Sequence, residues 1–378
     1  MAKNGSGARG SAPKPERGSV AISEPPTRER DDFANSGTWQ RRHLLDVDDF
    51  SRAELELVLD TADAMKEVLA REVPRVPALR GTTLVTLFYE DSTRTRASFE
   101  LAGKVLGADV INIAAKGSSI EKGESLIDTV LTLQAIGTDV LIMRHYASGA
   151  PYLAARHANF RVVNAGDGWH AHPTQALLDA YTIRSRLGDI RGRRIVIVGD
   201  ISHSRVARSN LWSLTALGAE VVVCAPPTLL PAGLDGSAGL TAGGCARSDA
   251  AERDPSASLR AGLPPVRVEH DLDRAVEGAD VVMTLRLQKE RQASGLLPSL
   301  REYSRLYQVN SARLARARPD ALVMHPGPMN EGIEISAEVA HGARSLIEEQ
   351  VTNGVAVRMA VLYLMVRGTR PEAASRTS

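Results

Sequence analysis

The chain has 378 residues, 43% of them hydrophobic, and a formal net charge of +1. That length suits two domains with substantial cores, and the balanced charge gives no electrostatic reason to expect nucleic-acid or membrane partners. Two cysteines, Cys224 and Cys245, are too few for a disulfide framework or a cysteine-rich zinc site. The sequence has neither an apolar run of membrane-spanning length nor a signal-peptide core, which predicts a soluble cytoplasmic protein.

Both ends of the chain and one internal segment have the composition of disordered sequence. Residues 1–38 are rich in Gly, Ser, Pro, Arg and Glu and nearly lack large apolar side chains, so we expect a disordered extension there. Residues 231–265 have a similar bias and predict a flexible surface insertion. We expect residues 367–378 to form a disordered tail.

Between these segments, strand and helix patterns alternate twice. In the first series, apolar runs predict strands at 82–88, 109–113, 140–143 and 161–164, and helical spacing predicts helices at 93–106, 125–133 and 173–187. In the second series the same patterns occur at 194–200, 205–217, 220–224, 280–284 and 321–324. One long helix is expected at 345–366.

Such alternation is typical of parallel strands joined by helices. The sequence therefore predicts an α/β fold with two doubly wound domains, each a mainly parallel sheet flanked by helices. We place the domains at 39–188 and 189–344, with the helix 345–366 joining the first. Ligands of such sheets bind beyond the carboxyl ends of the strands, so we expect the active site in the cleft between the two domains.

The stretch Ser-Thr-Arg-Thr-Arg at 92–96 lies where the first predicted strand ends and a helix begins. Unpaired N–H groups and the positive end of the helix dipole favour an anion there. The three hydroxyl groups add donors, and Arg94 and Arg96 add planar charge suited to phosphate oxygens. Because no G-x-x-x-x-G-K-[ST] sequence is present, we interpret this stretch as a phosphate site other than a P-loop. An ordinary helix start with solvated arginines is the alternative.

Other polar residues follow the neighbouring strands of the first series. Arg144 comes directly after the strand 140–143, where it could polarise a carbonyl group, unless it is an ion-paired surface arginine. The loop 166–168 leads to His172 and Gln175, which share one side of a helix start, although a single histidine is usually structural. All these residues should surround one crevice.

The loop 117–124 places Lys122 between glycines, so it could bring an ammonium group to an anion and close as a lid. A mobile surface loop is the alternative interpretation.

In the second series, Arg205 and Arg286 each follow a strand, and two arginines could each bind a carboxylate, which predicts a small dicarboxylate ligand. The turn His-Pro-Gly-Pro at 325–328 is rigid and could hold an amine with a backbone carbonyl. A dinucleotide site is disfavoured, because the loop after the strand 194–200 lacks G-x-G-x-x-G.

Taken in order, these motifs resemble those of the aspartate/ornithine carbamoyltransferase family over roughly residues 40–366. The resemblance implies that carbamoyl phosphate is held by Ser92, Thr93, Arg94, Thr95, Arg144, His172, Gln175 and Ser118. It implies that aspartate is held by Lys122, Arg205, Arg286 and Gln288, and that the backbone of Gly327 and Pro328 contacts both substrates. Catalytic roles would belong to Arg94, Thr95, Lys122, Arg144 and His172. The family also implies a homotrimer in which Ser118 and Lys122 reach into a neighbour's site.

Within the family, the second half of the chain favours aspartate over ornithine as the acceptor. The ornithine-type motifs His-Cys-Leu-Pro and Asp-x-x-x-Ser-Met-Gly are absent, and two arginines would repel the side-chain ammonium of ornithine. The expected reaction transfers the carbamoyl group to the α-amine of L-aspartate, an early step of pyrimidine biosynthesis, without a metal or cofactor. Carbamoyl transfer to another amino acid and a non-catalytic binding role are the alternatives.

Two points depart from the family or lie beyond the sequence. Glu331 stands where relatives commonly carry arginine, so we expect an altered geometry of the substrate loop. Association with a regulatory chain or a dihydroorotase is left open.

Overall fold

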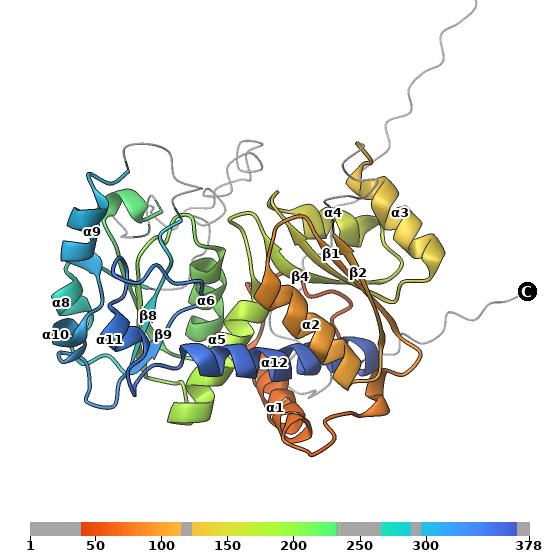
Figure 1. Ribbon diagram of the computed structural model, residues 1–378, viewed down its shortest axis with the longest axis horizontal. Helices are drawn as coiled ribbons and strands as arrows, with labels where there is room; N and C mark the ends of the chain where they lie inside the picture. The colour runs from red at the N-terminus through yellow and green to blue at the C-terminus, as the bar shows by residue number, and fades with distance from the viewer. Residues whose placement is uncertain (1–38, 115–122, 232–233, 235–265, 289–295, 369–378) are drawn as a thin grey trace, which may run out of the picture. The chain divides into compact units, whose positions relative to one another are not determined.

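The computed structural model describes residues 39–114, 123–231, 234, 266–288 and 296–368 (Figure 1). Residues 1–38, residues 369–378 of the predicted tail, the predicted insertion except Pro231 and Leu234, Ser118 and Lys122 lie outside the described residues. Arg367 was expected to belong to the disordered tail, but it is the last residue of the C-terminal helix.

The first sheet consists of four parallel strands in the order β2-β1-β3-β4. The strands are β1 (Thr83–Phe88), β2 (Asp109–Ala114), β3 (Val140–His145) and β4 (Arg161–Asp167). The chain crosses from β1 to β2 on one side and then returns to place β3 on the other side of β1. The carboxyl ends of β1 and β3 therefore flank a point where the strand order reverses, which is the usual position of a ligand crevice.

The second sheet consists of five parallel strands in the order β7-β6-β5-β8-β9. They are β5 (Arg194–Val198), β6 (Glu220–Cys224), β7 (Arg267–Glu269), β8 (Val281–Thr284) and β9 (Leu322–Met324). Here the order reverses between β5 and β8. The predicted α/β class with two parallel sheets flanked by helices is confirmed.

Several helices begin at side chains that satisfy their first N–H groups. Ser51, Ser125 and Ser204 each accept a hydrogen bond from the backbone of the first turn of α1, α3 and α6. The larger helices are α1 (Arg52–Leu69), α2 (Thr93–Val105), α3 (Leu126–Ile136), α4 (Ala150–His157), α5 (Pro173–Leu187), α6 (Arg205–Ala216), α9 (Leu300–Tyr307) and α12 (Ile347–Arg367). Shorter helices are α8 (Leu272–Ala275), α10 (Ser311–Leu314) and α11 (Ala337–Ala340).

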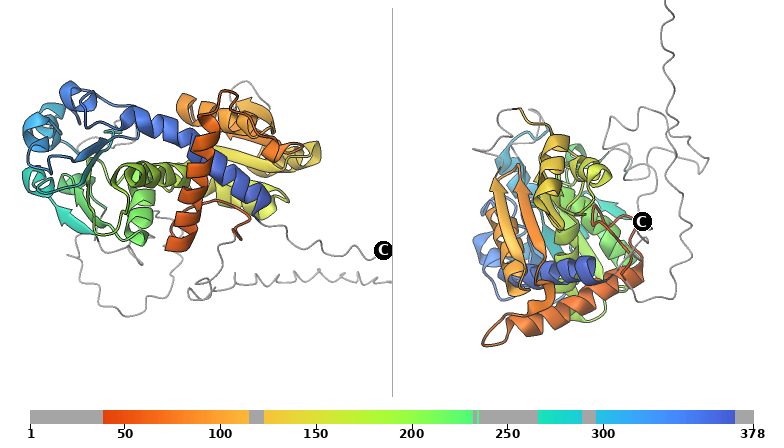
Figure 2. Two further views of the ribbon diagram at one scale, coloured as in Figure 1. Left: turned by 90° about the horizontal axis from the view of Figure 1, so that it is seen from below. Right: turned by 90° about the vertical axis from the view of Figure 1, so that its right-hand side faces the viewer.

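The C-terminal helix α12 links the two sheets. It follows β9 and packs along α1, α2 and α5, as Figures 1 and 2 show. One continuous apolar core contains side chains of both sheets, such as Leu84 of β1 and Val196 of β5. The C-terminal helix thus contacts helices of the first half of the chain, and its assignment to the first domain stays a prediction. The exact domain boundary near residue 188 stays a prediction.

Two local expectations were wrong. Arg144 lies within β3 rather than after it, and Gly166 and Asp167 belong to β4 rather than to a loop. The reason is that His145 and Asp167 are still paired across the sheet, while buried Asp167 accepts hydrogen bonds from Gly149 N and Ala171 N. The sequence analysis also missed the strand β7 and the helices α4, α8, α9, α10 and α11. Within the described part of the chain, every helix is too short or too polar to cross a bilayer.

Candidate active site

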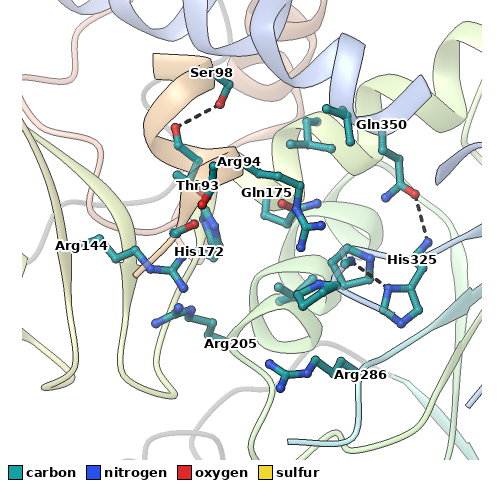
Figure 3. A pocket seen from close by; sticks show the side chains of 18 of the residues that line it. Thr93, Arg94, Ser98, Arg144, His172, Gln175, Arg205, Arg286, His325 and Gln350 are labelled. Atoms are coloured by element: carbon teal, nitrogen blue, oxygen red, sulfur yellow. Dashed lines mark hydrogen bonds between the residues drawn. The ribbon is translucent and has the colours of Figure 1, made fainter. Parts of the chain in front are cut away.

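A cavity of about 610 Å³ lies at the carboxyl ends of the strands of both sheets (Figure 3). Every site residue that the family resemblance implies and the structure describes lines this cavity. From the first half of the chain these are Ser92, Thr93, Arg94, Thr95, Arg144, His172 and Gln175, and from the second half Arg205, Arg286, Gln288, Gly327 and Pro328. Ser118 and Lys122 lie outside the described residues. The structure therefore brings together residues that lie more than two hundred positions apart.

Some polar residues near these motifs have other surroundings. Arg96 is exposed and does not line the cavity. His145 is buried between Tyr89 and Tyr146, with ring centroids 4.3 Å away on each side, and it accepts a hydrogen bond from Ala147 N. The expectation that Arg96 and the segment 166–168 surround the crevice was wrong, because neither is among the residues that line the cavity.

The start of α2, where the sequence predicts a phosphate site, lines the cavity with Ser92, Thr93, Arg94 and Thr95. Ser92 precedes the helix without capping it, so its hydroxyl group is not used to satisfy the first turn. The guanidinium group of Arg94 lies against the backbone of Gly327, where a Cβ atom would come within 2.8 Å of Arg94 Cζ. Burial and nearby Arg286 lower the pKa of Arg94. Two arginines from opposite halves of the chain thus raise the positive potential of one cavity, which favours anions.

Glu90 holds two of the predicted site arginines. Its Oε2 atom lies 3.2 Å from Arg144 Nε and 2.8 Å from Arg205 Nη2. Arg205, which is buried, also donates to the carbonyl oxygen of Gly168 at 3.1 Å. The sequence analysis gave Glu90 no role, although it lies two residues before the phosphate motif, because an acid beside an anion site has no obvious use until its partners are known.

His172 is uncharged in this environment. It is 4% exposed, and its pKa lies well below the usual value because of burial and then the positive charges of Arg205, Arg144 and Arg358. Its backbone N–H donates to Ser209 Oγ at 3.0 Å, which holds the start of α5. Buried Nδ1 has no partner among the described residues. A neutral imidazole can donate one hydrogen bond to a carbonyl oxygen without adding a proton to it.

The sequence analysis also missed the contribution of α12, which lines the cavity with Ile347, Gln350, Val351 and Arg358. Arg358 is buried, lies 5.2 Å from the ring of Phe99 and donates to Gly354 O at 3.0 Å. Burial lowers its pKa to about 10. The available signal was a charged residue inside an otherwise apolar helical run.

Glu331 does not line the cavity. Its carboxylate Oε1 lies 3.1 Å from His341 Nε2 in an exposed pair. The expected influence of this acid on the substrate loop would therefore have to be indirect.

The comparisons with known proteins agree with this geometry. Residues 42–185 match the family profile "Aspartate/ornithine carbamoyltransferase, carbamoyl-P binding domain", and residues 191–365 match "Aspartate/ornithine carbamoyltransferase, Asp/Orn binding domain". The aspartate carbamoyltransferase catalytic subunit of Roseiflexus sp. (strain RS-1) is 59% identical over 324 residues, which cover 86% of this chain and 95% of the relative. That of Heliobacterium modesticaldum is 53% identical over 331 residues, or 88% and 97%.

Solved structures give the same family. Aspartate transcarbamoylase from Trypanosoma cruzi in complex with N-(phosphonacetyl)-L-aspartic acid is 32% identical, with a TM-score of 0.70 and coverage of 85% of this chain and 94% of that one. Ornithine carbamoyltransferase from Pyrococcus furiosus is 28% identical, with a TM-score of 0.71 and coverage of 88% and 99%. Profiles, relatives and structures all span both halves of the cavity. The chain therefore belongs to the aspartate/ornithine carbamoyltransferase family.

Proposed function

We propose that this chain transfers the carbamoyl group of carbamoyl phosphate to the α-amine of L-aspartate, giving N-carbamoyl-L-aspartate and phosphate. The observation that carries the proposal is the shared cavity, in which the helix start with Arg94 faces Arg205 and Arg286. The first offers a site for phosphate, and the other two offer partners for two carboxylates.

In the reaction, the uncharged amine of aspartate attacks the carbamoyl carbon. A C–N bond forms, the C–O bond to phosphate breaks, and the amine loses a proton that the departing phosphate can accept. Thr95, Arg144 and neutral His172 donate hydrogen bonds to the developing oxyanion, while Arg94, Ser92 and Thr93 stabilise the leaving phosphate. Much of the acceleration comes from holding the two substrates in attack geometry.

The acceptor is assigned from charge. Arg205 and Arg286 attract a dicarboxylate and repel the side-chain ammonium of ornithine. Gln288, Gly327 and Pro328 also line the cavity, and we expect the backbone of Gly327 and Pro328 to contact both substrates.

The direct test is colorimetric detection of carbamoylated product from carbamoyl phosphate with either aspartate or ornithine. Product with aspartate alone is expected. Product with ornithine alone would overturn the assignment of Arg205 and Arg286 while leaving the phosphate site intact. No product with either amino acid from protein that binds carbamoyl phosphate would favour a non-catalytic role.

We further propose a cytoplasmic homotrimer with active sites shared between subunits. Support comes from large apolar side chains that are exposed on α2, β2 and α3, namely Leu101, Ile111, Leu131 and Ile136. β2 is an edge strand, and residues 115–122 connect it to α3. A second copy covering this edge would receive Ser118 and Lys122 beside its own cavity. A regulatory chain or a dihydroorotase remains an additional partner to test.

Mixing two inactive variants tests the shared site. Lys122→Ala and Arg94→Ala subunits should regain activity in hybrid trimers, because some sites then receive both intact residues. Exchange of subunits is checked by native mass spectrometry. Demonstrated exchange without any recovery would contradict a shared site.

A further inference from the structure

Asp179 is the centre of a buried polar network beneath the cavity. This aspartate of α5 is fully buried, and its carboxylate accepts hydrogen bonds from three side-chain amides. Gln175 Nε2 donates to Oδ1 at 3.0 Å, and Gln350 Nε2 donates to the same oxygen at 2.7 Å. Asn210 Nδ2 donates to Oδ2 at 2.8 Å. The donors come from α5, α12 and α6, so one carboxylate joins three helices.

The direction of every hydrogen bond in this network is fixed from one end. The backbone N–H of His325 can only donate, and it donates to Gln350 Oε1 at 3.0 Å (Figure 3). Gln350 must therefore present its Nε2 atom to Asp179, whose Oδ1 then acts as an acceptor. Gln175 meets that same oxygen and must also present its Nε2 atom.

The orientation of the Gln175 amide affects the cavity. Gln175 lines the cavity, and its Nε2 atom is turned towards Asp179, so its Oε1 atom is the one turned away from Asp179. An amide oxygen accepts hydrogen bonds, and a carbamoyl group carries an NH₂ group that donates them. An acetyl group of the same size has a methyl group in that place and can make no such bond.

We propose that Asp179 is a positioning residue that fixes the amide of Gln175 with its oxygen towards the substrate, and that it thereby sets the preference for carbamoyl phosphate over acetyl phosphate. This inference rests on the proposed function. Asp179 does not touch the substrate; it acts through Gln175. Phosphate binding is assigned to Arg94 and its neighbours, so it should be independent of this network.

The test is the ratio of the inhibition constant of acetyl phosphate to the KM of carbamoyl phosphate. Asp179→Leu keeps the volume of the side chain but removes both acceptor oxygens. We expect the ratio to fall about 3- to 10-fold, the value of one hydrogen bond, while inhibition by inorganic phosphate changes less than about twofold. A Gln175→Leu variant should lose the same preference, and adding Asp179→Leu to it should cause no further loss.

Asp179→Asn is the matched control. Asn210 Nδ2 donates both to Asp179 Oδ2 at 2.8 Å and to Val206 O at 3.1 Å, so an amide group in place of Oδ2 should cost some stability at Asn210. The asparagine can still keep its own oxygen towards Gln175 and Gln350. The preference should therefore be retained in Asp179→Asn. If the Asn and Leu variants lost the preference for carbamoyl phosphate equally, the negative charge of Asp179 would be responsible and not its hydrogen bond with Gln175. That result would overturn the proposal.

An unchanged ratio in folded Asp179→Leu would also overturn it. Should this variant not fold, neutron diffraction from the wild-type protein decides the matter, because deuterons on Gln175 must point at Asp179 and not into the cavity. Failure of the proposed function is recognised separately, since the wild-type protein would then form no carbamoyl aspartate.

Discussion

The carboxylate of Glu90, just after β1, lies 2.8 Å from the guanidinium group of Arg205, at the start of α6. This ion pair joins the two halves of the chain at the edge of the cavity. The same carboxylate faces Arg144, so it screens two positive groups from each other in a poorly solvated site.

Replacing Glu90 by Gln should therefore impair catalysis. Without the negative charge, Arg144 and Arg205 repel each other and lose their fixed positions, so we expect kcat/KM for aspartate to fall about 10- to 100-fold. Steady-state kinetics with Asp91→Asn as the charge control measure this effect. Equal kinetics for Glu90→Gln and the wild type would show that the pair does not position the arginines.

Gly327→Ala should selectively damage the phosphate half of the site. Gly327 has a φ of +64°, and a Cβ atom there would lie 2.8 Å from Arg94 Cζ, so Arg94 must move. We expect KM for carbamoyl phosphate to rise at least about tenfold, because Arg94 is assigned to bind the phosphate.

Gly332→Ala separates this clash from backbone strain. Gly332 also has a positive φ, +81°, but nothing lies within 4 Å of its Cβ position. Both variants should lose about 1–2 kcal/mol of stability, but Gly332→Ala should retain its affinity for carbamoyl phosphate. Similar kinetic defects in both would assign the loss to strain.

Arg286→Gln should weaken aspartate binding far more than carbamoyl phosphate binding. Removing a charged partner of a carboxylate typically costs about 2–5 kcal/mol, so KM for aspartate should rise 30-fold or more. Arg274→Gln in the same half of the chain, where the side chain is 75% exposed, is the control and should be nearly silent. A rise confined to KM for carbamoyl phosphate would contradict the assignment of Arg286.

His43 should make stability depend on pH. Burial, and then the charges of Arg42 and Arg161, lower its pKa to about 4, and its Nδ1 accepts a hydrogen bond from Val162 N at 3.0 Å. The unfolded chain binds the proton more readily, so the stabilisation is present above about pH 6.5 and is lost as the pH falls towards 4.

His43→Asn is the matched variant, because the asparagine oxygen can accept the same hydrogen bond without titrating. Urea unfolding at several pH values should show a weaker loss of stability between pH 6.5 and 4 for this variant than for the wild type. Parallel curves would show that His43 does not contribute to the acid sensitivity.

The sequence by itself determined the elements and the chemistry of each motif. Strand and helix periods are local properties of the sequence, and so is the presence of hydroxyl and guanidinium groups at the start of α2. Parallel strands gather their carboxyl ends at one edge, which is why Arg94, His172 and Arg286 could be expected to meet.

Only the tertiary structure decided which groups hold these residues in place. Glu90 accepts a hydrogen bond from Arg205, which lies 115 positions later in the chain. Asp179 accepts one from Gln350, which lies 171 positions later. Hydrogen bonds and ion pairs of this kind depend on distances of about 3 Å between groups on different helices. The packing of α12 against α5 sets the distance between Asp179 and Gln350, and no local pattern encodes it.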